Sequence, residues 1–175
     1  NAENICSYFN SSKKIKIALI CKNNKNAKIA LRAKKFNIPL YLISKNDLKE
    51  GSFLTSSLKD YNVNYIVLAG FLLKIPQFLI DLYPKKIINI HPSLLPKYGG
   101  KGMYGKNIHQ KVLENNELET GITIHYVNKN YDEGEIIFQK KLSLSKKESI
   151  ESLEEKIHFL EFTFFPKIIE KIITK

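Results

Sequence analysis

The stretches Asn64–Ala69 (NYIVLA), which ends at Gly70, and Lys86–Ile90 (KIINI), which Pro92 closes, decide the fold of this chain. Both are short, apolar and rich in β-branched residues, as is typical of strands that are buried on both faces of a parallel sheet. A helix is predicted between them from Pro76 to Tyr83, because proline suits the first position of a helix. This order of strand, helix and strand indicates an α/β fold.

The same alternation continues toward both ends of the chain. Further strands are predicted at Ile15–Cys21, Leu40–Ile43, Gly121–Val127 and Glu135–Leu142. Further helices are predicted from an Asn26 cap to Phe36, from Gly105 to Asn116 and from Ser149 onward, whereas Ser44–Tyr61 is less regular. We therefore expect one domain over residues 1–175, with a Rossmann-like, mostly parallel twisted sheet, helices on both faces and an antiparallel hairpin at one edge.

Two local patterns concern the C-terminal helix. Ser152-x-x-Glu155 matches a capping box, in which the side chain of the first residue accepts a hydrogen bond from the backbone of the fourth. Pro166 lies further along the same apolar stripe. Because proline has no backbone N–H and its ring clashes with the preceding turn, we expect Pro166 to kink or break this helix.

The composition is that of an ordinary globular protein, with 43% hydrophobic and 26% charged residues. No apolar run reaches the roughly 18 residues of a membrane span and no signal peptide is visible, so membrane association is not expected. The cysteines, Cys6 and Cys21, lack the spacing of metal ligands and are too few for a disulfide scaffold. This favours a cytoplasmic location.

The net charge of +11 raises the possibility of a nucleic-acid partner. All but one of the 28 basic residues are lysine, however, and Arg32 is the exception. Proteins that read bases or grip phosphates with two hydrogen bonds favour the arginine fork. Since the lysines are scattered along every segment, the charge is interpreted as a solvated lysine coat, and a nucleic-acid-binding module is kept as the alternative.

The most informative stretch is Asn89-Ile90-His91-Pro92, at the carboxyl end of a predicted strand. Asn89 and His91 are two residues apart, so their side chains leave the same face of the strand. The amide can donate a hydrogen bond to a developing oxyanion, and the imidazole is an acid or base near working pH. The alternative is that Asn89 satisfies loop backbone and His91 is a buried structural histidine; the combination favours catalysis.

A second candidate is the loop Tyr131-Asp132-Glu133-Gly134-Glu135 between the last two predicted strands. Its acids could bind a metal, act as a base or form a solvated turn. A metal site is not favoured, because no spacing brings histidine ligands to the loop. An Asp near a His can orient the imidazole and stabilise its charge.

Three stretches resemble one family over most of the chain. VLAGFLLKIP at Val67–Pro76, NIHPSLLPKYGGKGMYG at Asn89–Gly105 and GITIHYVNKNYDEGEIIFQ at Gly121–Gln139 are similar to the phosphoribosylglycinamide formyltransferases. The resemblance implies transfer of a formyl group from 10-formyltetrahydrofolate, the cosubstrate, to the amine of glycinamide ribonucleotide in purine biosynthesis. It implies small-molecule substrates, with no metal, nucleic acid or membrane, and a monomer or homodimer.

The resemblance also implies site residues. Its catalytic set corresponds to Asn89, His91 and Asp132, in which Asn89 and a protonated His91 would stabilise the oxyanion and Asp132 would hold His91 in its cationic form. The implied folate-binding residues are Leu72, Leu73, Lys74, Ile75, Asn89, Asn128, Lys129, Asn130, Tyr131 and Asp132. Those implied for the ribonucleotide are Asn1 and Glu161. His125 is expected to be structural or to support the set, and His109 and His158 are interpreted as surface or packing residues.

The chain departs from the family pattern in two places. Relatives begin with a strand and a glycine-rich turn that cradles phosphate, whereas this sequence opens at Asn1 with neither. Two neighbouring strands would then each lose a partner, so we expect the domain to be N-terminally truncated and the natural protein to be longer by about a dozen residues. The region Ser44–Tyr61 also offers no arginine for a basic contact that some relatives place there.

Two kinds of rival interpretation remain open. Methionyl-tRNA formyltransferase and formyltetrahydrofolate deformylase share the same Asn, His and Asp core, but carry additional domains that are not seen here. A non-enzymatic nucleotide-binding or RNA-binding module would leave Asn89, His91 and Asp132 unrelated in space.

Overall fold

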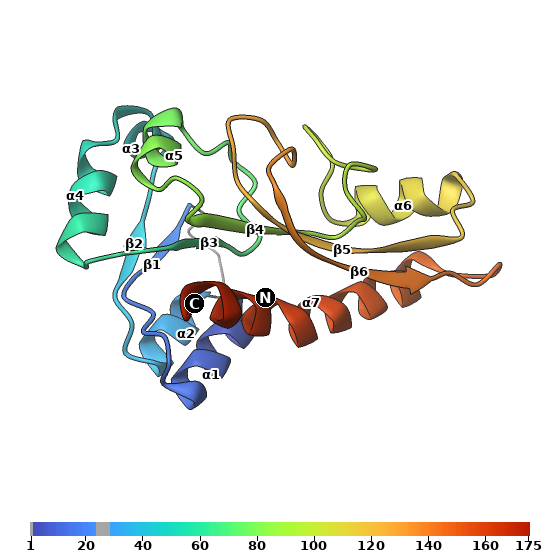
Figure 1. The fold of residues 1–175 in the computed structure, drawn as a ribbon, viewed down its shortest axis with the longest axis horizontal. Coiled ribbons are helices and arrows are strands. Elements are labelled where there is room, and N and C mark those ends of the chain that lie inside the picture. Colours follow the sequence, from blue (N-terminus) through green and yellow to red (C-terminus); the bar gives the residue numbers. More distant parts are fainter. Residues whose placement is uncertain (1, 24–28) are drawn as a thin grey trace.

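The computed structural model of the protein describes residues 2–23 and 29–175 (Figure 1). The helices are α1 (Ala2–Ser12), α2 (Ile29–Lys35), α3 (Lys45–Glu50), α4 (Ser52–Asp60), α5 (Gln77–Leu82), α6 (Lys106–Glu114) and α7 (Ile150–Ile173). The strands are β1 (Ile20–Lys22), β2 (Leu40–Leu42), β3 (Ile66–Leu68), β4 (Ile87–His91), β5 (Glu119–Tyr126) and β6 (Ile136–Ser143). The predicted Asn26 cap lies outside the described residues.

The described strands form two sheets. β1 pairs with β2 in parallel, and β3, β4, β5 and β6 form a second sheet in that order. In the second sheet β3 and β4 are parallel, whereas β5 runs antiparallel to β4 and forms a hairpin with β6 at the sheet edge. The predicted α/β class, with parallel strands and an antiparallel edge hairpin, is confirmed.

The first predicted strand is shorter than expected. Only Ile20–Lys22 of the Ile15–Cys21 region forms a ladder, with Leu40–Leu42 as its partner. The preceding residues have no neighbouring strand, and Ile15 and Ile17 pack against the main core instead. Within the described residues β1 and β3 are each paired on one side only, so no ladder joins the two sheets.

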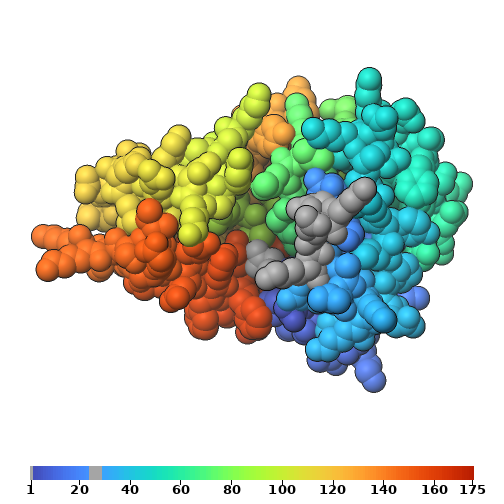
Figure 2. Space-filling model, turned by 180° about the vertical axis from the view of Figure 1, so that it is seen from behind, coloured from blue at the N-terminus to red at the C-terminus, as the bar shows by residue number. Residues whose placement is uncertain are grey.

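Alternating side chains of β4 separate two hydrophobic cores. Ile88 and Ile90 face a core built with α1, α6 and α7, whereas Ile87 faces a core built with α3, α4 and α5. The helices therefore cover both faces of the sheet, as predicted. α6 and α7 contact each other and lie side by side in Figure 2.

The region predicted to be less regular contains two helices. Ser44 caps α3 by accepting a hydrogen bond from the backbone N–H of Asp47, and the carboxylate of Asp47 accepts one from the backbone of Ser44. Gly51 joins α3 to α4 in the left-handed region at φ +78°, where glycine is unstrained. Two short helices, the first of them capped by Ser44, therefore make up most of this stretch.

Two predictions about α7 are corrected. The helix begins at Ile150 and its N-cap is Ser149, whose side chain accepts from the backbone N–H of Ser152, so the pattern Ser152-x-x-Glu155 lies inside the helix. Pro166 does not break α7, which continues to Ile173. Proline leaves the carbonyl of Phe162, four residues earlier, without its helical donor. The side chain of Asn4 in α1 donates to that carbonyl at 2.6 Å and replaces the missing bond.

Among residues 2–23 and 29–175, no helix has the combination of length and apolar character needed to cross a membrane.

Ile157 tests how far α7 stabilises the fold. Its side chain is fully buried in the main core, so Ile157→Ala removes apolar contacts and leaves a cavity. We expect the free energy of unfolding, measured by urea denaturation, to fall by about 2–5 kcal/mol. Phe159 lies on the same helix but is 69% exposed. Phe159→Ala should therefore change the free energy of unfolding by no more than about 0.5 kcal/mol. Equal losses in the two variants would contradict this account of the core.

His109 on α6 should make stability depend on pH. Its side chain is buried, and this burial lowers its pKa, although the carboxylate of Glu154 opposes the shift. The unfolded chain therefore takes up a proton near pH 6.5 while folded His109 stays neutral, so stability is lost as pH falls below about 6.5. His109→Gln should lose less stability between about pH 7.5 and 5.5 in urea titrations. The exposed His158 makes a smaller contribution to the lowered pKa of His109, so His158→Gln should retain most, but not all, of the wild-type acid loss.

Candidate active site

Strand β4 carries two polar side chains on one face. Asn89 and His91 alternate with Ile88 and Ile90, which face the core under α6 and α7. The two polar side chains therefore point to the opposite face of the sheet. Pro92 follows directly and ends the strand.

Strand β5 adds two more polar side chains to the same face. The antiparallel register sets His125 opposite Asn89 and Thr123 opposite His91. The pairing of β5 with β6 shifts register next to His125, as in a β-bulge, an irregularity that is frequent beside active sites. His91, Thr123 and His125 are all buried, so the strands build a polar patch that is enclosed by protein.

The loop between β5 and β6 brings Asp132 to this patch. A Cβ atom on Gly134 would lie 1.7 Å from the carbonyl oxygen of Tyr126, so only glycine lets the loop fold back against β5. The backbone N–H of Asn130 donates to the side chain of Asn128 at 2.9 Å and stiffens the loop. Asp132 itself adopts a left-handed conformation, with φ +56°.

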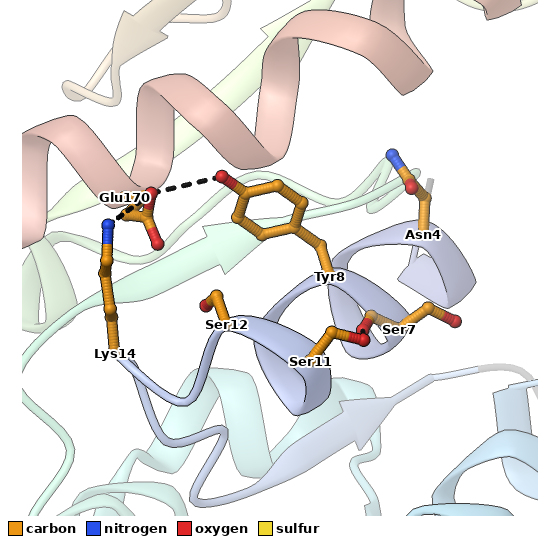
Figure 3. Close-up of a pocket in the computed structure, with 7 residues that line it drawn as sticks. All are labelled: Asn4, Ser7, Tyr8, Ser11, Ser12, Lys14 and Glu170. Atoms are coloured by element: carbon orange, nitrogen blue, oxygen red, sulfur yellow. Dashed lines mark hydrogen bonds and ion pairs between the residues drawn. The ribbon is translucent and has the colours of Figure 1, made fainter.

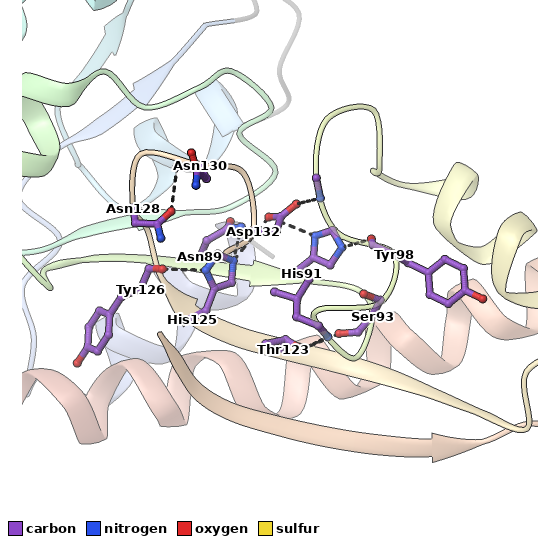
Figure 4. Close-up of polar contacts among 12 residues, drawn as sticks. Asn89, His91, Ser93, Tyr98, Thr123, His125, Tyr126, Asn128, Asn130 and Asp132 are labelled. Atoms are coloured by element: carbon purple, nitrogen blue, oxygen red, sulfur yellow. Dashed lines mark hydrogen bonds and ion pairs between the residues drawn. The ribbon is translucent and has the colours of Figure 1, made fainter. Parts of the chain in front are cut away.

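The amide, the imidazoles and the carboxylate form one connected cluster (Figure 4). Asp132 Oδ1 lies 3.5 Å from His91 Nδ1 and 3.7 Å from His125 Nε2. Asn89 Nδ2 lies 3.2 Å from the same His125 nitrogen. His125 therefore connects Asn89 to Asp132, and Asp132 lies against both imidazoles.

Backbone carbonyls determine which ring nitrogen of each histidine carries a proton. His91 Nε2 lies 2.7 Å from the carbonyl oxygen of Tyr98, which can only accept, so this nitrogen donates. His125 Nδ1 donates in the same way to the carbonyl of Tyr126 at 2.8 Å. His125 Nε2 then faces both Asn89 Nδ2 and the carboxylate of Asp132. The amide of Asn89 carries two N–H groups, so one remains available beside this contact.

Burial decides the protonation of His91. Removal from water lowers the pKa of His91, and this effect exceeds the opposing contributions of the Asp132 carboxylate and the Tyr98 carbonyl. The neighbouring His125 lowers it further. The carboxylate of Asp132 favours the cationic form of His91 and burial opposes it, so the expectation that Asp132 holds His91 in its cationic form stays a prediction.

Asp132 remains ionised despite its burial. Desolvation raises its pKa, but the polar contact with His125, the charge of His91 and the backbone N–H of Gly100 together bring the pKa below its ordinary value. That N–H donates to Oδ2 at 3.0 Å, which leaves Oδ1 toward the two imidazoles. The site therefore holds a carboxylate beside an imidazole, a pair that can accept and return a proton.

A hollow lies between two of the predicted folate-binding segments, one of which leads along the chain to Asp132. It has a volume of about 290 Å³ and is lined by Lys74, Ile75, Pro76, Gln77 and Lys129. The loop after β3 and the loop after β5 thus meet at one opening. Ile75 is buried there, whereas Leu72, from the same loop, is 57% exposed.

A larger groove, of about 530 Å³, lies elsewhere, between α1 and α7 (Figure 3). Tyr8 donates to Glu170 at 3.1 Å across it, and Lys14 contacts the same carboxylate. None of the predicted catalytic residues lines this groove. The polar cluster on β4 and β5 is therefore the better candidate for chemistry.

Of the residues predicted for the ribonucleotide, Glu161 belongs to a different element from this cluster. Glu161 is buried on α7, which packs on the opposite face of the sheet from Asn89 and His91. Asn1 lies outside the described residues. Within the part of the chain that the structure describes, no group of three or more His, Cys, Asp and Glu side chains is arranged to hold a metal ion.

One member of the site was expected only in outline and one escaped the sequence analysis. His125 was expected to be structural or supporting, and its contacts with Asn89 and Asp132 depend on the register between β4 and β5, which the sequence does not state. Tyr98 contributes a backbone carbonyl, a group that every residue has, so its side chain gave no signal. The position of His125 two residues after Thr123 in an otherwise apolar strand was the only available sign.

Comparison with known proteins shows where the chain belongs. Residues 1–169 match the family model described as formyl transferase. A Bacillus subtilis phosphoribosylglycinamide formyltransferase is 34% identical over 160 residues, which cover 89% of this chain and 80% of that relative. A chloroplastic phosphoribosylglycinamide formyltransferase of Arabidopsis thaliana is 35% identical over 161 residues, which cover 89% of this chain and 55% of the relative. The chain thus spans about half the length of that plant protein.

Solved structures share the same fold. The phosphoribosylglycinamide formyltransferase of Bacillus halodurans superposes with a TM-score of 0.88 at 29% identity, covering 99% of this chain and 90% of its own. A formyltetrahydrofolate deformylase of Pseudomonas syringae reaches 0.80 at 21% identity, covering 95% of this chain and 55% of its own, and shows the fold alone. From the extent of the family match and the identity with the Bacillus subtilis relative, this chain belongs to the formyl transferase family.

Proposed function

We propose that the chain transfers the formyl group of 10-formyltetrahydrofolate to the amine of glycinamide ribonucleotide, a step of purine biosynthesis. The observation that carries this proposal is the contact of His91 with Asp132 at 3.5 Å, on the same face of the sheet as Asn89. The hollow between Lys74 and Lys129 is lined by two of the segments implied for the folate. The names of the relatives support the same reaction.

The reaction proceeds by direct transfer. Attack of the ribonucleotide amine on the formyl carbon forms a new C–N bond and places negative charge on the formyl oxygen. Asn89 donates its free N–H to that oxygen, an interaction worth on the order of 100–1,000-fold in rate for such donors. The C–N bond to the folate then breaks and the carbonyl re-forms on the product.

The pair of His91 and Asp132 moves the proton. The attacking amine releases its proton to the neutral imidazole, and Asp132 stabilises the resulting positive charge. The same proton then passes to the leaving folate nitrogen, which returns the pair to its starting state. The developing oxyanion also raises the pKa of His91 during the reaction, because a nearby negative charge favours the cation.

No covalent enzyme intermediate is required. Burial raises the pKa of the Cys21 thiol to about 11 and raises that of Cys6, so neither supplies a thiolate at neutral pH. Ser93 and Thr123 lie near His91, but their hydroxyl groups donate to the carbonyls of Lys97 and Ser93. These hydroxyl groups stabilise the backbone from Ser93 to Lys97. The nucleophile that attacks the formyl carbon is therefore the ribonucleotide amine.

A cytoplasmic location and a monomer or homodimer complete the proposal. Both cysteines are unpaired, which suits a reducing compartment. One relative is named as chloroplastic, so cell fractionation is the direct test of location. Size-exclusion chromatography at several concentrations decides the oligomeric state.

His91→Ala and Asp132→Asn should each lower kcat on the order of 100-fold or more, because each removes one half of the proton-transferring pair. The assay follows ribonucleotide-dependent loss of the formyl group from the folate. Initiator tRNA and water serve as alternative acceptors, and a preference for either would replace the proposed acceptor. The exposed His158→Ala and Asp60→Asn are matched controls. Near-normal kcat in either site variant would contradict the assignment.

The pH profile should report the burial of His91. Since His91 must be neutral to accept the proton, kcat/KM falls as pH drops through its pKa, and burial places that midpoint below the ordinary value of about 6.5. Asp132→Asn removes a carboxylate that raises this pKa, so the midpoint should move lower still. A kcat/KM that instead rises as pH drops through this midpoint would show that the free enzyme uses the imidazolium.

A further inference from the structure

The turn Lys97–Gly100 contacts both members of the His91 and Asp132 pair. The carbonyl of Tyr98 accepts from His91 Nε2 at 2.7 Å, and the N–H of Gly100 donates to Asp132 Oδ2 at 3.0 Å. A Cβ atom on the intervening Gly99 would lie 3.3 Å from the Cβ of Asp132, so the turn and the loop pack closely. One short segment of backbone therefore sets the positions of both side chains.

This turn is not a relaxed conformation. Tyr98 has φ +56°, in the left-handed region that bulky residues rarely adopt. Such a conformation persists only where the surroundings hold it in place. The side chain of Tyr98 supplies that restraint, because its hydroxyl donates to Glu117 Oε1 at 2.9 Å and accepts from Asn115 Nδ2 at 2.8 Å.

Glu117 is the fixed point of this network. Its backbone N–H donates to the carbonyl of Val112, a fully buried residue of α6. Its carboxylate accepts from Lys97 Nζ at 3.0 Å to each oxygen, so it contacts the turn twice. Hydrogen bonds from Lys97 and Tyr98 lower the pKa of Glu117 and keep it ionised at neutral pH.

We propose that Glu117, acting through Tyr98, is a positioning residue that holds His91 and Asp132 at their working separation. This inference rests on the proposed function, because it assigns the pair a shared proton. Glu117 touches neither side chain of the pair. Its effect passes through the backbone of the turn, from the hydroxyl of Tyr98 to the carbonyl that fixes His91.

Loosening the turn has a defined consequence for His91. The groups that face its ring are the Asp132 carboxylate, the His125 imidazole and the Tyr98 carbonyl. Of these, the carboxylate and the carbonyl favour the protonated ring, and both depend on the turn. If the turn moves away, His91 loses two stabilising partners while its burial remains, so it should titrate at lower pH.

The test compares Tyr98→Phe and Glu117→Ala with Glu119→Ala. Glu119 lies two residues from Glu117 and also pairs with a lysine, Lys141, at 2.8 Å, but it acts on Lys97 of the turn only weakly, through its charge. We expect kcat to fall about tenfold in the first two variants with KM within about twofold, since misplacement by ~1 Å costs up to ~100-fold. Glu119→Ala should behave as wild type, and Glu117→Gln, which keeps an acceptor for Tyr98, should retain more activity than Glu117→Ala.

The second readout is the titration of His91 by NMR, with its signal identified by its loss in His91→Gln. Tyr98→Phe should lower the titration midpoint of His91 relative to wild type, whereas Glu119→Ala should not. A fall in kcat without this shift, or no change in either, overturns the positioning role. Wild-type protein without formyl transfer would overturn the proposed function instead, and the titration would still decide whether the turn positions His91. If Glu117→Ala fails to fold, Tyr98→Phe carries the test.

Discussion

The antiparallel pairing of β4 with β5 is the constraint on which the site depends. It sets His125 opposite Asn89 and Thr123 opposite His91, while Ile122 and Ile124 turn toward α6 and α7. A slip of one residue in β5 would exchange the two faces and bury polar groups among the helices. The apolar core therefore fixes the register, and through it the positions of the reactive side chains on the other face.

The sequence was sufficient where short-range rules apply. The spacing of Asn89 and His91 fixed their common face, because side chains alternate along any strand. The fold class followed from the alternation of β-branched runs and helical patterns, which needs no knowledge of contacts. The cap of α7 could not be chosen in this way, since Ser149 and Ser152 offer the same chemistry and tertiary packing selects between them.

Long-range features lay beyond the sequence for a physical reason. The contact of Asp132 with His91 joins residues 41 positions apart and depends on the fold of a loop that only Gly134 allows, so the spacing left it open and only the family resemblance implied it. The balance between burial and charge at His91 depends on how much protein covers the ring, which residue identity does not reveal. Backbone groups such as the Tyr98 carbonyl leave no trace in residue identity.

The hydrogen bond from Asn4 to the carbonyl of Phe162 has a consequence for the order in which the protein assembles. It joins residues 158 positions apart, so the chain must close a very long loop before the bond can form. Until α1 docks, the middle of α7 keeps an unpaired carbonyl opposite Pro166 and its amides should exchange with solvent more readily. The helix α7 therefore becomes fully hydrogen-bonded late in folding, after α1 has packed against it.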